Sequence, residues 1–470
     1  MAMRSGFREI FYLFLLALLI SSLQLLRFVL QRPLAQGVLT HEQLVLDLKT
    51  LQQQVADYSA FIVLHPENLK RLQQRVGQVT VRYPQNIDLN RFNTEVRKLL
   101  SLINDPGASV SALPMASGIL PIKLQQMQQR WLALDNNNQP IDSKRPFLTH
   151  IDGVPIQRWE TAAKRMLAAK LPITTQLQQL DVLRRELGLQ VKPTVTLTLT
   201  SDDSNITHLQ LPVSDKATSK RSPAISQWQW LGDNTELFRF GDLERLENDR
   251  QLQRDFQKAL QAGTLILDLR QTTGFSPILL QQLVQGRQYP ATQPIGYGRY
   301  RRASQLRSDF LAPLGLVPLQ YFQLFPAISV TLAKQQQPEL SQWFAKTPVV
   351  SPASVVPATS QQLVLLIGPG CRYECEWLAY YAKDWRKTLL IGDATLGDMG
   401  RKHEFRLPSS DISVSITASL AYDQYGNQLS GKGITPDLQL PLPPNVKWPQ
   451  LLKALRQYFG KINASGESPE

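Results

Sequence analysis

The most reactive side chains of this 470-residue chain gather around one glycine-rich turn. The letters LVLLIGPGCRYECEW describe an apolar strand, a turn at Gly368-Pro369-Gly370 and the start of a helix flanked by Cys371 and Cys375. Backbone N–H groups at a helix start favour anions and thiolates. Two cysteines four residues apart there, with Cα atoms ~6 Å apart, can also form a disulfide. A pair of inert buried thiols is the remaining alternative.

Two further loops follow apolar strands in the same part of the chain. TLILDLRQTTGF runs through Asp268-Leu269-Arg270 to Gly274, and TLLIGDATLGDMG also ends in a glycine-containing loop. Ligands of open α/β sheets gather at the carboxyl ends of the strands. The three loops therefore predict a cleft, with buried strands at Thr264–Leu269 and Leu363–Ile367 and one helix at Leu243–Leu260 beside them.

The elements that position these loops follow from the hydrophobic periodicity. Apolar residues recur at helical spacing in LVLDLKTLQQQV and FNTEVRKLLSLI, short alternating runs follow, and strands then alternate with amphipathic helices. The last pattern predicts βαβ units and a largely parallel sheet. The predicted parts are an N-terminal segment at 1–37, a helical lead-in at 38–105, a mixed domain at 117–213, an α/β core at 225–445, and a C-terminal helix and tail at 446–470.

Residues 1–37 predict a targeting or anchoring segment. Two arginines near the start precede a mostly apolar stretch at residues 10–30, which approaches the ~20 residues that a spanning helix needs. Pro33 stands where a cleavage site requires a small residue. We expect an uncleaved single-pass anchor in the cytoplasmic (inner) membrane with the body in the periplasm. A cleaved signal peptide with a secreted periplasmic body is the alternative.

Composition limits the partners. The chain has 51 Lys and Arg against 38 Asp and Glu, a formal net charge of +13. This excess suits an anionic membrane surface, but the chain lacks a basic run with interleaved aromatic residues, so no nucleic acid is expected. The basic stretch Gly298–Arg307 is expected to be a solvated face. Five histidines without ligand spacing and only two cysteines predict no metal, and no cofactor is expected.

Four blocks together resemble the family of C-terminal processing (tail-specific) proteases. LILDLRQTTGF matches that family's L-I-L-D-L-R-N-N-x-G-G, GCRYECE matches G-x-A-S-A-S-E, GDATLGD matches G-x-x-T-x-G-K, and GKGITPD matches G-x-G-I-x-P-D, in the family's order. FLTHIDGVPIQRW resembles the strand-turn segment of its PDZ-like domain. The resemblance implies a crotonase/ClpP-like α/β core at 225–445, a PDZ-like domain at 117–213 and an N-terminal helical segment.

In that family a serine at the strand-to-helix turn attacks the peptide carbonyl and a buried lysine takes its proton. The gap-free match places Tyr373 at the serine position and Asp398 at the lysine position. Members that use histidine have it where this chain has Gly107. The second glycine of the loop that helps hold the oxyanion, beside Gly274, corresponds to Phe275. Both catalytic residues are therefore replaced.

These replacements leave several functions open. The first is a protease homologue that no longer cleaves and binds peptide or protein ends in the cell envelope, or regulates a partner, with Gly274, Phe275 and Glu374 in the cleft loops. The second is an active peptidase, serine-type by family or with Cys375 as nucleophile and Lys402 as partner after a shift in register. A tyrosine nucleophile would be new chemistry on this fold. The third is a purely architectural role with a filled cleft.

Overall fold

The computed structural model describes residues 12, 14–22, 37–110, 118–127, 130–135, 139–166, 173–203, 205–214, 226–285, 294–302, 315–319, 337–346, 361–440, 442 and 448–465. Most of the predicted anchor at 1–37 lies outside these residues, although 14–22 are helical. Within the described ranges, we find no helix with the length and apolar character required to span a bilayer.

A layer of helices follows the N-terminal segment. It contains α2 (His41–Tyr58), α3 (Phe61–Leu64), α4 (Pro66–Arg82) and α5 (Leu89–Ser101), and the short strands β1 (Val38–Leu39) and β2 (Ile87–Asp88) pair beside them. Helix α2 begins with a capping box in which Thr40 and Gln43 satisfy each other's backbone N–H groups. Its apolar residues at helical spacing face the core of the layer.

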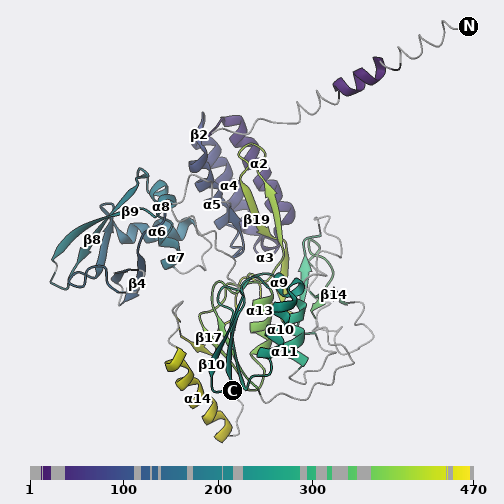
Figure 1. The fold of residues 1–470 in the computed structure, drawn as a ribbon. Helices are drawn as coiled ribbons and strands as arrows, with labels where there is room; N and C mark the ends of the chain where they lie inside the picture. Colours follow the sequence, from purple (N-terminus) through teal and green to yellow (C-terminus); the bar gives the residue numbers. More distant parts are fainter. Residues whose placement is uncertain are drawn as a thin grey trace, which may run out of the picture.

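This helical layer continues into a β-hairpin from the far end of the chain. Strands β18 (Lys402–Arg406) and β19 (Ser413–Thr417) form the hairpin, and β3 (Ser109–Val110) pairs with β19. Strand β19 lies beside the helices (Figure 1). Leu407, Ile412, Val414 and Ile416 share one hydrophobic cluster with the helices. The buried carboxylate of Asp47 also accepts the N–H groups of the hairpin turn, at 2.8 and 2.9 Å. Helices and hairpin therefore share one core.

Residues 118–214 form a separate sheet with its own core. The strands are β4 (Lys123–Met127), β5 (Arg130–Leu134), β6 (Phe147–Ile151), β7 (Val154–Pro155), β8 (Thr194–Thr200) and β9 (Ile206–Pro212), in the order β4-β5-β6-β8-β9 with β7 beside β6. Helices α6 (Ile156–Met166), α7 (Ile173–Leu177) and α8 (Leu180–Glu186) cover the sheet. Arg184 is fully buried and is held by Asp152, Asp181 and two backbone carbonyls.

The main sheet confirms the predicted α/β fold class with a largely parallel sheet. Its order is β10-β11-β12-β16-β17-β21, and all neighbours are parallel except the antiparallel edge strand β10. The strands are β10 (Gln227–Gly232), β11 (Thr235–Arg239), β12 (Thr264–Asp268), β16 (Gln362–Ile367), β17 (Thr388–Gly392) and β21 (Leu438–Gln439).

Helices cover both faces of this sheet. On one face lie α9 (Glu244–Asn248), α10 (Arg250–Ala259), α11 (Pro277–Gln285) and α13 (Glu374–Ala382), and on the other lies α14 (Trp448–Ser465) (Figure 1). The single helix expected at Leu243–Leu260 is two helices, because Asp249 caps a new helix start by accepting the N–H groups of Gln251 and Leu252.

A smaller antiparallel sheet has the order β14-β15-β13-β20, formed by β13 (Gly296–Tyr300), β14 (Leu316–Pro318), β15 (Phe344–Lys346) and β20 (Ser419–Tyr422). The expectation of a solvated basic face here was wrong for Arg299 and Arg301, which are 4% and 7% exposed. Their guanidinium groups donate to backbone carbonyls, among them those of Ser341 and Asp57. Hydrogen bonding offsets the cost of burying these charges.

Candidate functional site

The turn between β16 and α13 holds Tyr373 in a strained conformation. Tyr373 is the N-cap of α13 with φ 58° and ψ −117°, a region that bulky residues rarely occupy. Its N–H donates to the carbonyl of Asp398 at 2.9 Å, and its own carbonyl accepts the N–H of Trp377 at 3.2 Å. The loop after β17 and the first turn of α13 thus hold the strained residue in place.

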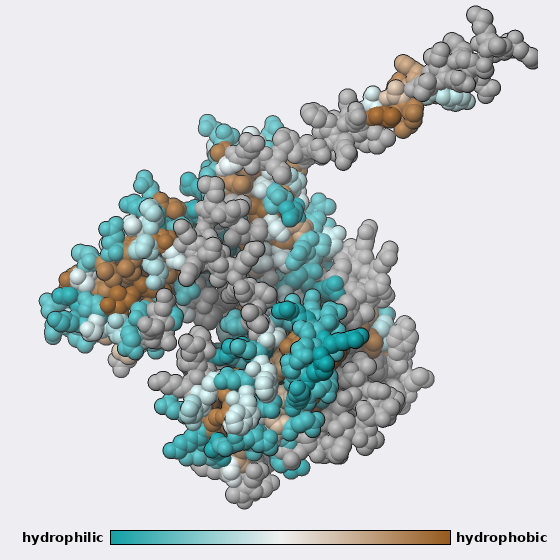
Figure 2. All heavy atoms as spheres, in the orientation of Figure 1, coloured by the Kyte–Doolittle hydropathy of each residue, from teal (hydrophilic) through white to brown (hydrophobic). Residues whose placement is uncertain are grey.

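Tyr373 lies in a cleft of about 620 Å³. The lining residues come from α9, from the loops after β12 and β16, and from β18 and the residue before it: Glu244, Glu247, Gly274, Phe275, Tyr373, Arg401, Lys402 and Glu404. The surface over α9 and α10 is strongly hydrophilic (Figure 2). The Tyr373 and Phe275 rings pack with centroids 4.9 Å apart, and Lys402 Nζ lies 5.5 Å from the Tyr373 centroid. The tyrosine ring therefore occupies the space beside the Gly274 loop.

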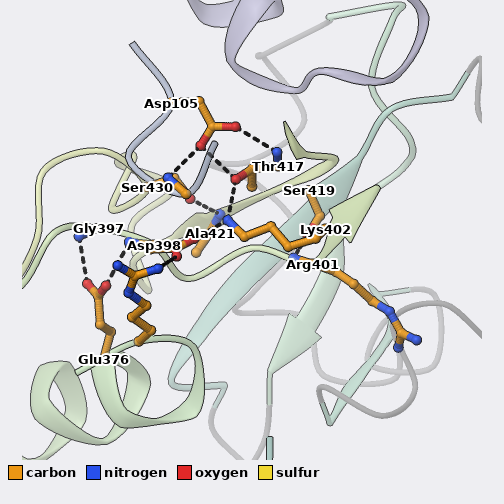
Figure 3. A network of polar contacts seen from close by, with 12 residues as sticks. Asp105, Glu376, Gly397, Asp398, Arg401, Lys402, Thr417, Ser419, Ala421 and Ser430 are labelled. Carbon is orange, nitrogen blue, oxygen red and sulfur yellow. Dashed lines mark hydrogen bonds and ion pairs between the residues drawn. The ribbon is translucent and has the colours of Figure 1, made fainter. Parts of the chain in front are cut away.

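Lys402 belongs to a network of polar contacts with Asp105, Asp398 and Thr417 (Figure 3). Lys402 Nζ contacts the carboxylate of Asp398 and donates to Thr417 Oγ1 at 2.6 Å. Thr417 in turn donates its hydroxyl to Asp105 Oδ1 at 2.7 Å and its N–H to Asp105 Oδ2 at 2.6 Å. The Arg372 guanidinium lies 3.6 Å from the second Asp398 oxygen.

The electrostatics of this network keep Lys402 charged. Burial alone would lower the pKa of Lys402, but the carboxylates of Asp398 and Asp105 outweigh burial and raise that pKa above its ordinary value. Burial also raises the pKa of Tyr373. At neutral pH the site thus holds an ammonium and a neutral phenol, and a protonated amine cannot act as a general base. The Thr417 hydroxyl is buried and gives its proton to Asp105, so it is not a nucleophile beside a free amine.

The structure brings Gly107, Tyr373 and Asp398 together around Lys402. A Cβ atom built on Gly107 would lie 1.6 Å from Lys402 Nζ and 2.3 Å from Asp398 Oδ1. The Lys402 and Asp398 side chains therefore fill the volume that a side chain at position 107 would need. The Gly107 N–H is itself held by Asp105 Oδ1 at 2.9 Å.

The backbone donor after Tyr373 is used within the protein. The Glu374 N–H donates to the Gly274 carbonyl at 3.3 Å. The Glu374 side chain is 1% exposed, and its Oε2 lies 2.7 Å from Lys346 Nζ. Burial raises the pKa of Glu374, against the opposing effect of Lys346. Gly274 and Phe275 line the cleft as expected from their loop, whereas Glu374 does not.

Cys371 and Cys375 form a disulfide with their Cα atoms 5.4 Å apart. This corrects the alternative of a Cys375 nucleophile paired with Lys402, because the Cys375 sulfur is bonded to Cys371 and buried. Lys402 instead contacts Asp398, Thr417 and the Tyr373 ring. The disulfide also replaces the alternative of two free thiols, and it closes a short loop around Tyr373.

Glu376 fixes the loop that carries Asp398. Its carboxylate accepts the Thr395 hydroxyl at 2.8 Å. It also accepts the N–H groups of Gly397 and Asp398 at 2.9 and 2.6 Å (Figure 3). Burial raises the pKa of Glu376 to about 7. The two neighbouring glutamates thus serve separate partners on opposite sides of α13, in line with their spacing on a helix.

Sequence reasoning missed the rim carboxylates and Thr417. Glu244 and Glu247 are three residues apart, which places them on one helix face, and this spacing was the available signal. Glu404 and Thr417 carry no comparable signal, because their position depends on how the β18–β19 hairpin packs against the helical layer.

Comparison with known proteins supports the resemblance found in the sequence. Residues 239–440 match the model of peptidase family S41, and the predicted resemblance to the tail-specific protease family is confirmed. Among curated proteins, no sequence matches the chain.

Solved structures of CPAF are similar over almost the whole chain. Mature CPAF has a TM-score of 0.58 at 17% identity, covering 91% of this chain and 99% of CPAF. A CPAF mutant has a TM-score of 0.59 at 16% identity, covering 90% and 96% of the two chains. At these identities the likeness concerns the fold, and it supports the α/β core and the arrangement of the whole chain.

Proposed function

We propose that this protein is a non-cleaving S41 homologue that uses the inherited cleft to bind a peptide or protein end. The observation that carries this proposal is the packing at the turn, where the Tyr373 ring lies beside a Lys402 ammonium that pairs with Asp398 and whose pKa is raised. A hydroxyl that attacks a peptide carbonyl needs a neutral base within reach to take its proton. The amine at this centre, Lys402, is instead a charged ammonium and cannot take that proton.

Two features support a binding role rather than a purely architectural role with a filled cleft. The cleft keeps about 620 Å³ of space beside two aromatic rings and a charged rim. The positive φ of Tyr373 is a conformation that costs on the order of 1–3 kcal/mol and persists only where the surroundings enforce it. A site with apolar rings and a few charged groups suits an extended peptide.

The sheet unit at 118–214 supports a second contact. We propose that it is the PDZ-like domain at 117–213 and that it presents a terminal peptide to the cleft, because such grooves bind an extended chain end by backbone hydrogen bonds and side-chain pockets.

We further propose that residues 10–30 anchor the protein in the inner membrane with its body in the periplasm, or that they direct secretion to the periplasm. Fractionation of cells that express the full chain tests both routes: recovery in the membrane fraction supports the anchor, and recovery of a shortened soluble periplasmic form supports secretion. A cytoplasmic protein, protected from external protease in spheroplasts, contradicts both.

Cleavage is tested with an unstructured protein substrate and an active-site phosphonate probe. The unmodified protein should give neither turnover nor labelling, and the exposed-surface variant Arg406→Gln is the matched control for purification. A contaminating protease is recognised by equal activity in this control and in a Tyr373→Ala variant. Turnover that depends on Tyr373 would overturn the proposal.

Binding is tested separately with fluorescent peptides that carry free or amidated carboxyl ends. The expected result is saturable binding that Phe275→Ala weakens by about tenfold through loss of ring stacking, while Arg406→Gln leaves it unchanged. No binding of any peptide, with no change in melting temperature, would favour the architectural role.

A further inference from the structure

A second cavity of about 330 Å³ lies at the carboxyl ends of the parallel strands. It is lined by residues from the ends of β11, β12, β16 and β17 and from the segment before α14: Arg239, Asp268, Arg270, Gln271, Ile367, Gly368, Pro369, Gly392, Asp393 and Leu442. We call it the Arg239 cavity. It shares no lining residue with the Tyr373 cleft, so it does not depend on the function proposed for that cleft.

One wall of the Arg239 cavity offers a cation with free donors. Asp268 is 4% exposed in its side chain and accepts Arg270 at 2.8 Å and Arg239 Nε at 3.0 Å. Among the described residues, Asp268 is the only partner of the Arg239 guanidinium, which is 34% exposed. Its outer edge therefore remains available, and a guanidinium edge binds a carboxylate with two parallel hydrogen bonds.

The other wall offers an anion. The Asp393 carboxylate, at the end of β17, has no hydrogen bond or ion pair with another described residue, although its backbone N–H is bonded to Ile367. Asp268 stays ionised between two arginines, so the cavity carries two positive and two negative side chains. A simple anion on Arg239 would leave Asp393 unpaired, whereas a ligand with both charges satisfies the two free groups.

We propose that the Arg239 cavity binds a small zwitterion of the α-amino acid class. Its carboxylate pairs with Arg239 and its ammonium with Asp393. Its side chain lies against the apolar part of the wall formed by Ile367, Pro369 and Leu442. The volume is at the lower end of small-molecule sites and fits a ligand of this size.

The first test screens the twenty standard amino acids against the purified full chain at about 10 mM, a concentration suited to so small a ligand. At least one amino acid should raise the melting temperature and bind in calorimetry. The best one is then compared with its analogue lacking the amine and its analogue lacking the carboxylate; for L-leucine these are 4-methylpentanoate and 3-methylbutylamine. Each analogue should bind about tenfold more weakly or worse.

Variants assign the two contacts. Arg239→Gln and Asp393→Asn should each weaken binding by about tenfold or more, and Arg239→Lys, which keeps the charge beside Asp268, should weaken it less than Arg239→Gln. The surface variant Arg406→Gln should bind as the unmodified protein does. The proposal is overturned if no amino acid binds, if the deaminated analogue binds equally well, or if Arg239→Gln has no effect.

Discussion

Replacing Gly107 by alanine perturbs the buried network by a single methyl group. The new Cβ would lie 1.6 Å from Lys402 Nζ, so the ammonium must leave its place between Asp398 and Thr417. The backbone itself tolerates alanine, because the φ of Gly107 is outside the left-handed region. Overpacking costs roughly 1–3 kcal/mol and an unpaired buried charge roughly 3–5 kcal/mol. With partial relaxation of the flexible lysine, we expect a loss of about 3 kcal/mol in the free energy of unfolding.

The assay is a double-mutant cycle followed by urea unfolding and by melting temperature. In a Lys402→Ala background the clash with Lys402 Nζ is removed and only the Asp398 carboxylate must shift, so Gly107→Ala should cost about 1 kcal/mol, and the coupling energy should be about 2 kcal/mol. Gly77→Ala in α4 is the matched control, since its Cβ meets open space and should stabilise the helix by up to ~1 kcal/mol. Equal costs of Gly107→Ala in both backgrounds would refute the view that Lys402 fills this space.

Three further predictions concern a buried carboxylate, a buried ion pair and the disulfide. Burial raises the folded-state pKa of Glu376 from 4.5 to about 7, so the folded protein holds that proton more tightly than the unfolded chain, and the free energy of unfolding should fall as the pH rises from about 4.5 to about 7. In urea titrations at several pH values, Glu376→Gln should flatten this pH dependence, and an unchanged slope would contradict the assignment. Arg184→Met leaves Asp152 without its buried partner and should destabilise residues 118–214 by about 3–5 kcal/mol. Limited proteolysis should then cleave this sheet faster than in the unmodified protein, and an unchanged cleavage rate would contradict the prediction. Cys371→Ala/Cys375→Ala should lower stability by about 2 kcal/mol, as expected for so short a closed loop, and should not create peptidase activity; new thiol-dependent turnover after mild reduction of the unmodified protein would argue the opposite.

The core strands were predictable because they are buried on both faces. The expected strands Thr264–Leu269 and Leu363–Ile367 correspond to β12 (Thr264–Asp268) and β16 (Gln362–Ile367). Parallel strands of this kind are continuous apolar runs bounded by loop residues. The expected single helix Leu243–Leu260 is divided at Asp249, whose side chain caps the start of α10; hydrophobic periodicity alone does not reveal such a cap.

The candidate site was accessible to sequence reasoning only in part. Motif order placed Tyr373 and Asp398 at one centre, and the structure joins them by a backbone hydrogen bond. The role of Lys402 was misjudged, because its charge state depends on Asp105 and Asp398 converging from distant segments. Thr417 could not be found at all, since long-range packing of the hairpin sets its position. The same limit applies to Arg299, whose carbonyl partners lie far along the chain.

The β18–β19 hairpin has one end in the core of the N-terminal helices and the other, at Lys402 and Thr417, in the cluster completed by Asp105. A chain shortened to begin after residue 110 would lose Asp105 together with the helices, leaving the ammonium under-neutralised and the hairpin's apolar side in water. Excision of the helical layer should therefore yield aggregates instead of a trimmed, soluble core. Limited proteolysis that nicks the connection should release the pieces only after denaturation.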